Sequence, residues 1–396
     1  MLDLSVMTTD STSQKNFPLE TGVASVNVTA RIATELFTGF VSQSPIWFDN
    51  NSGVLSVNTQ SRRLGCIIYI LGQVARGRKV ESLLLSPSTE ELAELKKNIN
   101  SNGFDSGQLT SKASSVKHYL DIAIALHFLV RQGSVFNLTG RGLYLLQAVR
   151  PDAAHPYPLT GPSKTFFFHS LLATDYFGLS TIARLLLNGN RRPISIQREY
   201  QKELLYVLGG AASSSTSTRL ASLAKDRMIS IRNWKRPESY AEHLVSAKLH
   251  WLADLGILES VPSANTNLAA KKEHRDWLED LTNTTTPTDS HLLAFTLNYC
   301  STIQKREMFL TADNICSALD EAFKWLVREP TLAKIRCSDF LLFLLCFHTP
   351  LLLCLVKNKQ KLIQATTVEC HHHRYQIHFA SRPTQSFIIR HGKKSS

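Results

Sequence analysis

Several features that would mark a common class of protein are scarce or missing in this chain of 396 residues. It has seven cysteines and no CxxC pair, which argues against a zinc ribbon or a disulfide framework and favours reduced, buried thiols. Residues 1–16 lack a basic segment followed by an apolar one, so we expect no secretory signal. The most apolar run, 340–356, is divided by Pro350 and is shorter than the ~20 residues of a membrane-spanning helix. Together these absences predict a cytoplasmic protein that does not enter a membrane.

Motifs of common enzymes are missing too. No GxxxxGK[ST] loop occurs, and the Gly209-Gly210 pair is followed by serine and threonine without the required lysine. Carboxylates one helical turn apart, such as Glu199 and Glu203, are typical of a solvated face rather than of a metal-dependent nuclease. Cys370 precedes three histidines, but neighbouring residues of an extended segment point to opposite faces, which disfavours a closed zinc site. We therefore expect no metal and no cofactor, and favour a protein that is not an enzyme.

What the chain has is positive charge. Its 44 lysines and arginines exceed its 32 acidic residues, giving a formal net charge of +12 and a pI near 9.4. Such a surface raises the local concentration of phosphate by long-range attraction, so a polyanionic partner is expected. An apolar content of 43% is sufficient for two to four packed domains at this length.

Composition and periodicity predict a mainly α (α+β) fold of three tandem winged-helix modules with small β-hairpin wings. Proline and glycine cluster in 151–163, which is typical of a linker between domains. The expected segments are a mobile N-terminus and lead-in at 1–60, a first winged-helix module at 61–150, the linker at 151–163, a second module at 164–281, and a C-terminal helical plus winged-helix module at 282–396.

The first module is expected to contain helices at 64–74 and 114–130. Gly133 would end the second helix, and an apolar strand would follow it. The turn at 139–142 would then be the wing, with Arg141 on it.

The middle module centres on residues 216–258. A helix is expected to begin near Thr218, followed by a basic loop with arginines at 227, 232 and 236 and Lys235, and by a helix that ends at Gly256 before an apolar strand. This is the order of a helix-turn-helix. Upstream, 166–187 is expected to form two helices or one broken near 175–178, and a helix at 194–208 would stop at Gly209-Gly210.

A short repeat links these two modules. The sequence Leu-His-Phe-Leu at 126–129 recurs as Leu-His-Trp-Leu at 249–252, and each copy lies four residues before a glycine, Gly133 or Gly256. An apolar strand is expected after both glycines. We interpret this as two copies of one supersecondary unit offset by 123 residues.

The third module is expected to have a helix at 312–328 and strands at 375–380 and 386–390. The helix would place Leu319, Ala322 and Phe323 on one side. Before it, the charged segment 271–281 could be an insertion in the wing of the second module or a short helix.

Recognition chemistry is expected on the helix at 239–254, because the helix before the wing usually enters the major groove. Ser239, His243, Ser246 and His250 lie opposite its apolar side, whereas Lys248 falls within that side, which requires its ammonium to reach an edge. The candidate DNA-contacting residues are Arg141, Arg191, Arg192, Arg219, Lys225, Arg227, Arg232, Asn233, Lys235, Arg236, His243, Ser246, His250 and Arg382.

Two segments carry a family resemblance: FNLTGRGLYLL at 136–146 and ISIRNWKRPESYAEHLVSAKLHWLADLGIL at 229–258. With the three-module arrangement, they resemble the DNA-recognition half of FokI-type type IIS restriction endonucleases, over 62–258 and less closely in the C-terminal module. Those enzymes carry a C-terminal cleavage domain with an acidic-acidic-lysine metal site, and this sequence ends after the third expected hairpin. The resemblance therefore implies DNA recognition without cleavage.

The function we expect is binding of double-stranded DNA as a recognition or targeting subunit of a prokaryotic restriction or phage-defence system, with other subunits of that complex as further partners. Two alternatives stay open. One is a transcriptional regulator, and the other is a winged-helix protein-interaction scaffold that uses the apolar run 340–356 as an interface. A nuclease whose site is scattered among the modules is a further possibility.

Overall fold

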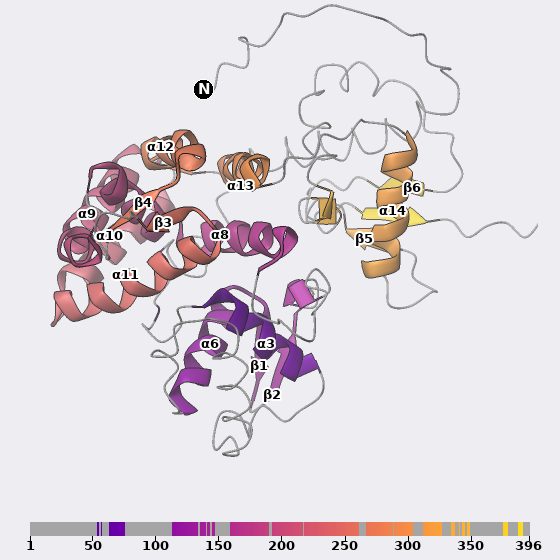
Figure 1. The fold of residues 1–396 in the computed structure, drawn as a ribbon, viewed down its shortest axis with the longest axis horizontal. Helices are drawn as coiled ribbons and strands as arrows, with labels where there is room; N and C mark the ends of the chain where they lie inside the picture. Colours follow the sequence, from indigo (N-terminus) through magenta and orange to yellow (C-terminus); the bar gives the residue numbers. More distant parts are fainter. Residues whose placement is uncertain are drawn as a thin grey trace, which may run out of the picture.

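The computed structural model describes residues 54, 57, 63–75, 113–133, 135–139, 141–142, 145–146, 159–189, 192–216, 218–260, 267–287, 289–303, 312–326, 334–336, 340, 343–344, 347–348, 375–378 and 387–390. This part of the chain is mostly helical with small antiparallel sheets, which confirms a mainly α fold (Figure 1). Within it, no helix combines the length and apolar character needed to cross a membrane.

The central element is helix α8 (Gly161–Leu187). In Figure 1 it lies between a first unit, which contains α3 (Leu64–Ala75) and α6 (Ala113–Ala125), and helices α12 (Arg275–Asn283) and α13 (Asp289–Ile303). It begins inside the expected linker, where the Thr160 side chain accepts a hydrogen bond from the Ser163 amide at 3.4 Å. Most of its residues are buried on all sides, as expected for a core helix. The helix is kinked at Asp175 (φ −136°, ψ 32°), which confirms the break expected near 175–178.

Four helices pack against α8, and a fifth packs on one of these. Rings from α8 lie against the covering helices, with Phe168 5.3 Å from Trp277 and 4.3 Å from Tyr299 between ring centroids. The charged segment after 271 forms a 3-10 turn and a helix rather than a wing insertion. The covering helices are α9 (Pro193–Ser214), α11 (Pro237–Asp254), α12 (Arg275–Asn283) and α13 (Asp289–Ile303), with α10 (Thr218–Arg232) on α9 and the 3-10 turn η2 (Lys272–His274) before α12.

Helix α9 continues through Gly209-Gly210 to Ser214, so the stop expected at the two glycines is wrong. The hydroxyls of Ser213 and Ser214 donate to the carbonyls of Gly209 and Gly210, at 2.9 and 2.6 Å, inside the helix. Extensive packing of α9 against α8, α10 and α11 outweighs the low helix propensity of two glycines.

The first unit contains α3 (Leu64–Ala75), α6 (Ala113–Ala125) and the antiparallel hairpin of β1 (Leu129–Gln132) and β2 (Val135–Leu138). Helix α3 confirms the expected helix at 64–74, but α6 ends five residues before Val130. Gly133 (φ 63°) lies in the hairpin turn and is not the helix stop, so the hairpin begins earlier in the chain than expected.

His127 ends α6 by adopting the left-handed conformation (φ 59°). The amide of Phe128 donates to the Ala123 carbonyl at 2.8 Å, and the amide of His127 donates to Ile124 at 2.9 Å. These two bonds form a Schellman motif, which glycine usually completes. With histidine in that position, the sequence offers no glycine to mark the end of the helix.

The same turn ends α11, with Gly256 (φ 78°) in the left-handed position and the Ile257 amide donating to Leu252 at 2.9 Å. A hairpin of β3 (Leu258–Ser260) and β4 (Leu268–Ala270) follows. His127 therefore corresponds to Gly256, an offset of 129 residues rather than 123. Two copies of a helix-and-hairpin unit are present, but the matching four-residue sequences at 126–129 and 249–252 are out of structural register.

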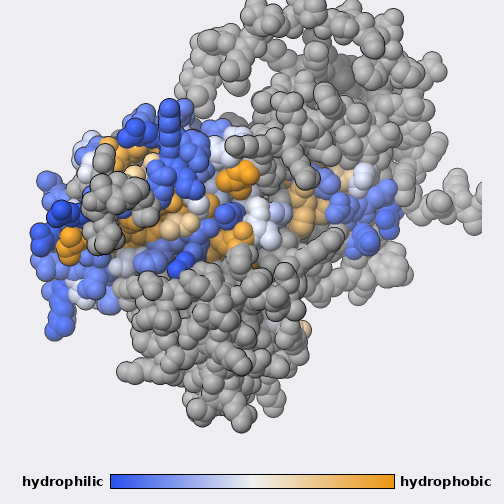
Figure 2. Space-filling view, viewed as in Figure 1, coloured by the Kyte–Doolittle hydropathy of each residue, from blue (hydrophilic) through white to orange (hydrophobic). Residues whose placement is uncertain are grey.

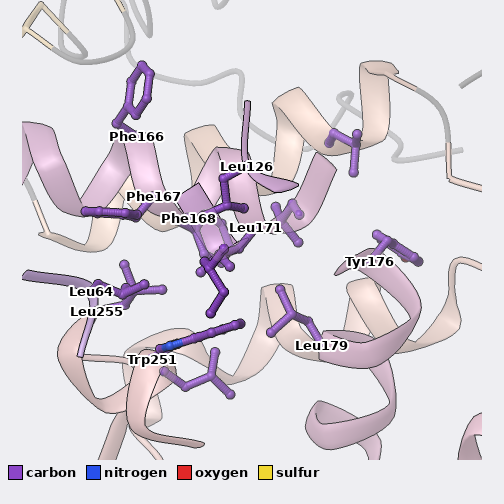
Figure 3. Packing of buried hydrophobic residues seen from close by; sticks show 14 of the residues in the cluster. Leu64, Leu126, Phe166, Phe167, Phe168, Leu171, Tyr176, Leu179, Trp251 and Leu255 are labelled. Carbon is purple, nitrogen blue, oxygen red and sulfur yellow. The ribbon is translucent and has the colours of Figure 1, made fainter. Parts of the chain in front are cut away.

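The first and second units share one apolar core. Asp254 at the end of α11 accepts hydrogen bonds from the Arg63 guanidinium at 2.8 Å and from the Leu64 amide, at the start of α3, at 3.0 Å. Beneath this contact, Leu64 lies beside Leu255 in Figure 3, close to the phenylalanines of α8. Phe128 adds ring contacts to Phe166 and Phe167 with centroids 5.6 and 5.7 Å apart.

The third unit contains α14 (Ala312–Leu326) and a three-stranded antiparallel sheet in the order β5-β7-β6. The helix, its buried side with Leu319 and Phe323, and the two late strands confirm the expectations. Phe340, Phe343 and Leu344 of the apolar run are buried, and Phe347 and His348 are half-buried. The strands are β5 (Lys334–Arg336), which was not predicted, β6 (Tyr375–His378) and β7 (Phe387–Arg390).

Cys66 and Cys300 in the described residues are buried and form no disulfide with another described residue, as expected for reduced cysteines packed in a core. Burial raises the pKa of the Cys66 thiol to about 12, so it stays protonated at neutral pH. The Cys66 thiol therefore lacks the lowered pKa of a nucleophilic cysteine.

Candidate nucleic-acid interface

The turn between α10 and α11 is an exposed basic part of the described chain. Helix α10 ends at Arg232, and the amides of Asn233 and Trp234 donate back into it at 3.1 and 3.2 Å. Pro237 then begins α11, where a fixed φ and a missing amide hydrogen suit the first helical position. A short, well-defined turn at 233–236 therefore separates two helices that both pack on α9.

Arg232 at the end of α10 and the turn cations Lys235 and Arg236 are exposed, and Asn233 beside them is exposed as well. None of these cations has an ion-pair partner among the residues that the structure describes. The partial positive charge at the start of α11 adds to theirs. The surface around α9, α10 and α11 is mostly hydrophilic (Figure 2). A polyanion approaching this turn would meet charge that the protein itself does not neutralise.

An aromatic pair lies within the same turn. The rings of Trp234 and Tyr240 are stacked, with centroids 5.3 Å apart and planes 22° from parallel. Trp234 is half-buried, whereas Tyr240 is 50% exposed. Tyr240 was missed among the candidate residues, although an aromatic residue three positions into a helix that follows a basic turn is a signal in the sequence.

The stripe expected to read bases on α11 is half-buried. Ser246 accepts a hydrogen bond from the Gln197 amide of α9 at 3.2 Å, and His250 donates to the Ser246 carbonyl at 2.7 Å. Ser239 and His243 are also half-buried, and they lie nearer the exposed N-terminal end of the helix. The part of α11 that can meet a ligand is therefore its N-terminal half.

Arg227 does not belong to the basic loop, because α10 extends through it to Arg232. It is half-buried and donates to the Val54 carbonyl at 3.2 Å, and its Nε atom is buried without a hydrogen-bond partner among the described residues. Burial lowers the pKa of this guanidinium, while Tyr200 and Asp175 act in the opposite direction. The Arg227 side chain therefore makes contacts inside the protein and is not part of the exposed basic surface.

Lys248 is wholly buried and pairs with the carboxylate of Asp175, at the kink of α8. Its ammonium therefore does not reach an edge, contrary to expectation. Gly178 makes this contact possible, because a Cβ atom there would collide with both charged groups. Burial lowers the pKa of Lys248, and the Asp175 carboxylate opposes that shift.

Arg141 is not on the hairpin turn, which includes Gly133 and follows the Gln132–Val135 pair. Its guanidinium donates to the Ser170 hydroxyl at 3.1 Å and lies 5.8 Å from the centre of the Phe166 ring, so it packs against α8. The turn is tight there, because a Cβ atom on Gly142 would collide with the Phe128 carbonyl.

The other candidate residues are scattered. Arg192 is exposed at the start of α9, Lys225 is exposed on α10, and Arg219 belongs to α10. Arg191 and Arg382 lie outside the described residues, as does the cysteine-histidine segment at 370–373.

Within the described residues, no group of three or more histidine, cysteine or acidic side chains is arranged to hold a metal ion. A small cavity of about 10 Å³ lies between α8, α11 and α12 and is lined by apolar side chains that include Leu172, Leu252 and Trp277. This is about the volume of one water molecule, without polar groups to hold one. It does not form a ligand site.

Comparisons of this chain with protein-family models, with curated protein sequences and with solved structures find no match.

Proposed function

We propose that this protein binds double-stranded DNA through the turn at 233–236 and the N-terminal half of α11, as a recognition or targeting subunit of a prokaryotic restriction or phage-defence system. One observation carries the proposal. Arg232, Lys235 and Arg236 are exposed together at the start of a helix, without ion-pair partners in the described part of the chain. A net charge of +12 supports the same partner.

The topology supports the finer assignment to winged helices. In that fold the first strand follows the first helix, pairs with the last strand, and leaves the middle strand at the edge. The third unit has this order, with α14 before β5, helical residues after it, and a sheet ordered β5-β7-β6. In the first two units a helix ends in a Schellman turn and leads into a hairpin. The defence role rests on the resemblance to the recognition half of FokI-type enzymes.

The proposed DNA contacts are of two kinds, contacts with phosphates and contacts with base edges. The cations of the turn would hold phosphates, which positions the protein on the duplex without reading its sequence. Asn233 can form paired hydrogen bonds with an adenine edge, and Ser239 and His243 lie on the neighbouring half-exposed part of α11. Residues further along α11 take no part, because Lys248 and its neighbours are buried.

Duplex binding measured over a range of salt concentrations tests this proposal. The logarithm of the affinity should fall linearly with the logarithm of salt concentration, because bound cations release counterions. Changing Arg232 or Lys235 to alanine should weaken binding and make the slope shallower by about 1 for each phosphate that the variant no longer neutralises.

The matched control is Lys202→Ala, which removes an exposed cation on α9 outside the turn and should leave the slope unchanged. Absent or salt-insensitive duplex binding would overturn the proposal. Incubation of protein and duplex with Mg²⁺ or Mn²⁺ should leave the DNA intact, and cut DNA would favour a nuclease instead.

A further inference from the structure

We infer that the stacked pair of Trp234 and Tyr240 is a platform for an unpaired base, so that the surface proposed for DNA prefers nucleic acid with a gap or an extruded base. This inference rests on the proposed function and names the form of DNA that the site recognises.

The stacked pair keeps one of its two rings accessible to solvent. Trp234 packs against the core and covers one face of Tyr240 at 5.3 Å, yet 50% of Tyr240 stays exposed. Half of the Tyr240 surface thus stays accessible although Trp234 stacks on its ring. A planar apolar group can extend the stack there, because offset stacking of aromatic rings is favourable.

A second exposed tyrosine provides a contrast. Tyr206 on α9 is 66% exposed, and its ring lies 5.0 Å from the guanidinium carbon of Arg184. Arg184 in turn pairs with Glu203 at 2.6 Å, so this tyrosine belongs to a local cation-carboxylate cluster. Tyr240 instead lies beside Lys235 and Arg236, which have no ion-pair partner in the described chain.

Charge around Tyr240 favours a nucleic acid. Its neighbours in the turn are cationic, whereas the exposed Glu238 and Glu242 lie about 160° around α11 from it, given about 100° of rotation for each residue. A phosphate backbone can thus follow the basic turn while a base reaches the ring. Single-stranded binding sites commonly combine cations along the backbone with aromatic rings under the bases.

An intact duplex cannot use this platform fully, because both faces of each internal base are already covered by neighbouring bases. A base in a gap, or one extruded from the helix, has a free face. The pair would therefore add affinity for the distorted form while the cations serve both forms. Stacking of one base on an aromatic side chain corresponds to roughly 5- to 150-fold in affinity.

The experiment compares binding to a short labelled duplex with binding to the same duplex carrying a short single-stranded gap. Tyr240→Ala should lose roughly 5- to 150-fold in affinity for the gapped DNA and at most about twofold for the intact duplex. Tyr240→Phe should keep the preference, since the ring remains. Tyr206→Ala is the matched control for an exposed tyrosine outside the turn, and it should bind both forms like the wild-type protein.

A second measurement does not depend on how well a variant folds. With 2-aminopurine in the gap, binding of the wild-type protein should quench its fluorescence, because the base stacks on Tyr240. Full binding of gapped DNA without quenching overturns the inference.

Two failures can be told apart. If the intact duplex binds with the expected salt dependence but Tyr240→Ala affects both DNAs equally or neither, the platform is wrong and the proposed function stands. If neither DNA binds, the proposed function fails and the inference fails with it.

Discussion

In the middle of this protein, cationic side chains at the start of α11 are exposed to solvent, whereas one further along the same helix is buried. Lys235 and Arg236 are exposed in the turn before α11, whereas Lys248, twelve residues after Arg236, has a side chain with 0% exposure. The exposed cations have no ion-pair partner in the described chain, and the buried one has a carboxylate from another helix. The turn cations are therefore available to a ligand, whereas Lys248 stabilises the core through its ion pair with Asp175.

The difference has an energetic consequence. An exposed charge is already solvated, so its removal changes the stability of the folded state little. A buried ion pair is different, because each charge has lost its water and depends on the other. Substitutions in the two regions should therefore affect different properties, stability in the interior and binding in the turn.

The largest effect is expected for Lys248→Met. Methionine has a similar length and no charge, so it leaves the Asp175 carboxylate buried without its partner. We expect a loss of about 3–5 kcal/mol in the free energy of unfolding. Urea denaturation of the wild-type protein and the variant measures it.

The double variant Asp175→Asn with Lys248→Met tests whether the pair itself is the cause. Removing both charges should recover most of the stability, because no unpaired charge stays buried. A double variant no more stable than Lys248→Met would show that the aliphatic packing of the lysine, and not its charge, matters.

A second interior effect, spread over several pH units, should appear as the pH falls. His169 on α8 lies 3.1 Å from the Thr296 hydroxyl, and burial lowers its pKa from 6.5 to about 3. Below pH 6.5 the unfolded chain binds a proton that the folded protein does not bind until about pH 3. Stability present above pH 6.5 should therefore be lost through that window, at up to about 1.4 kcal/mol per pH unit.

Unfolding curves at several pH values measure this loss, and His169→Gln, which removes the titration, should make the dependence shallower. The same pH dependence in the variant would mean that other groups cause it.

The smallest stability effect is expected in the turn. Replacing Arg232 and Lys235 by alanine should change the free energy of unfolding by no more than about 0.5 kcal/mol, because both side chains are exposed and unpaired in the described structure. The same urea titration measures it. A loss above about 1 kcal/mol would show that these cations stabilise the fold, and would weaken the contrast between turn and interior.

Apolar content and periodicity were sufficient to predict α3, α14 and the two strands of the late hairpin, and Gly256 marked the end of α11. These elements bury one apolar face, and that pattern is visible in a single segment. Glycine was a less dependable signal. Gly133 marks a hairpin turn rather than a helix end. Gly209-Gly210 lies inside α9, because packing against neighbouring helices outweighs local propensity there.

The candidate site was predictable in part. Arg232, Asn233, Lys235 and Arg236 were placed in one turn from the sequence, and the structure exposes all four. Arg227 and Arg141 also lie in basic segments of the sequence. In the structure, however, Arg227 donates to Val54 and Arg141 donates to Ser170, and these contacts hold both side chains against other parts of the fold. Composition identifies a cation, but whether its charge reaches solvent depends on residues far away in the sequence.

The sequence by itself determined the mainly helical class, the basic turn and most helix positions, because these depend on local pattern and charge. Only the tertiary structure decided which charges lie inside. Asp175 and Lys248 are 73 residues apart, and Arg63 and Asp254 are 191 residues apart. Each pair forms because two helices bring the residues together as the core closes, and the lost hydration of one charge is offset by the other. No local pattern contains that pairing.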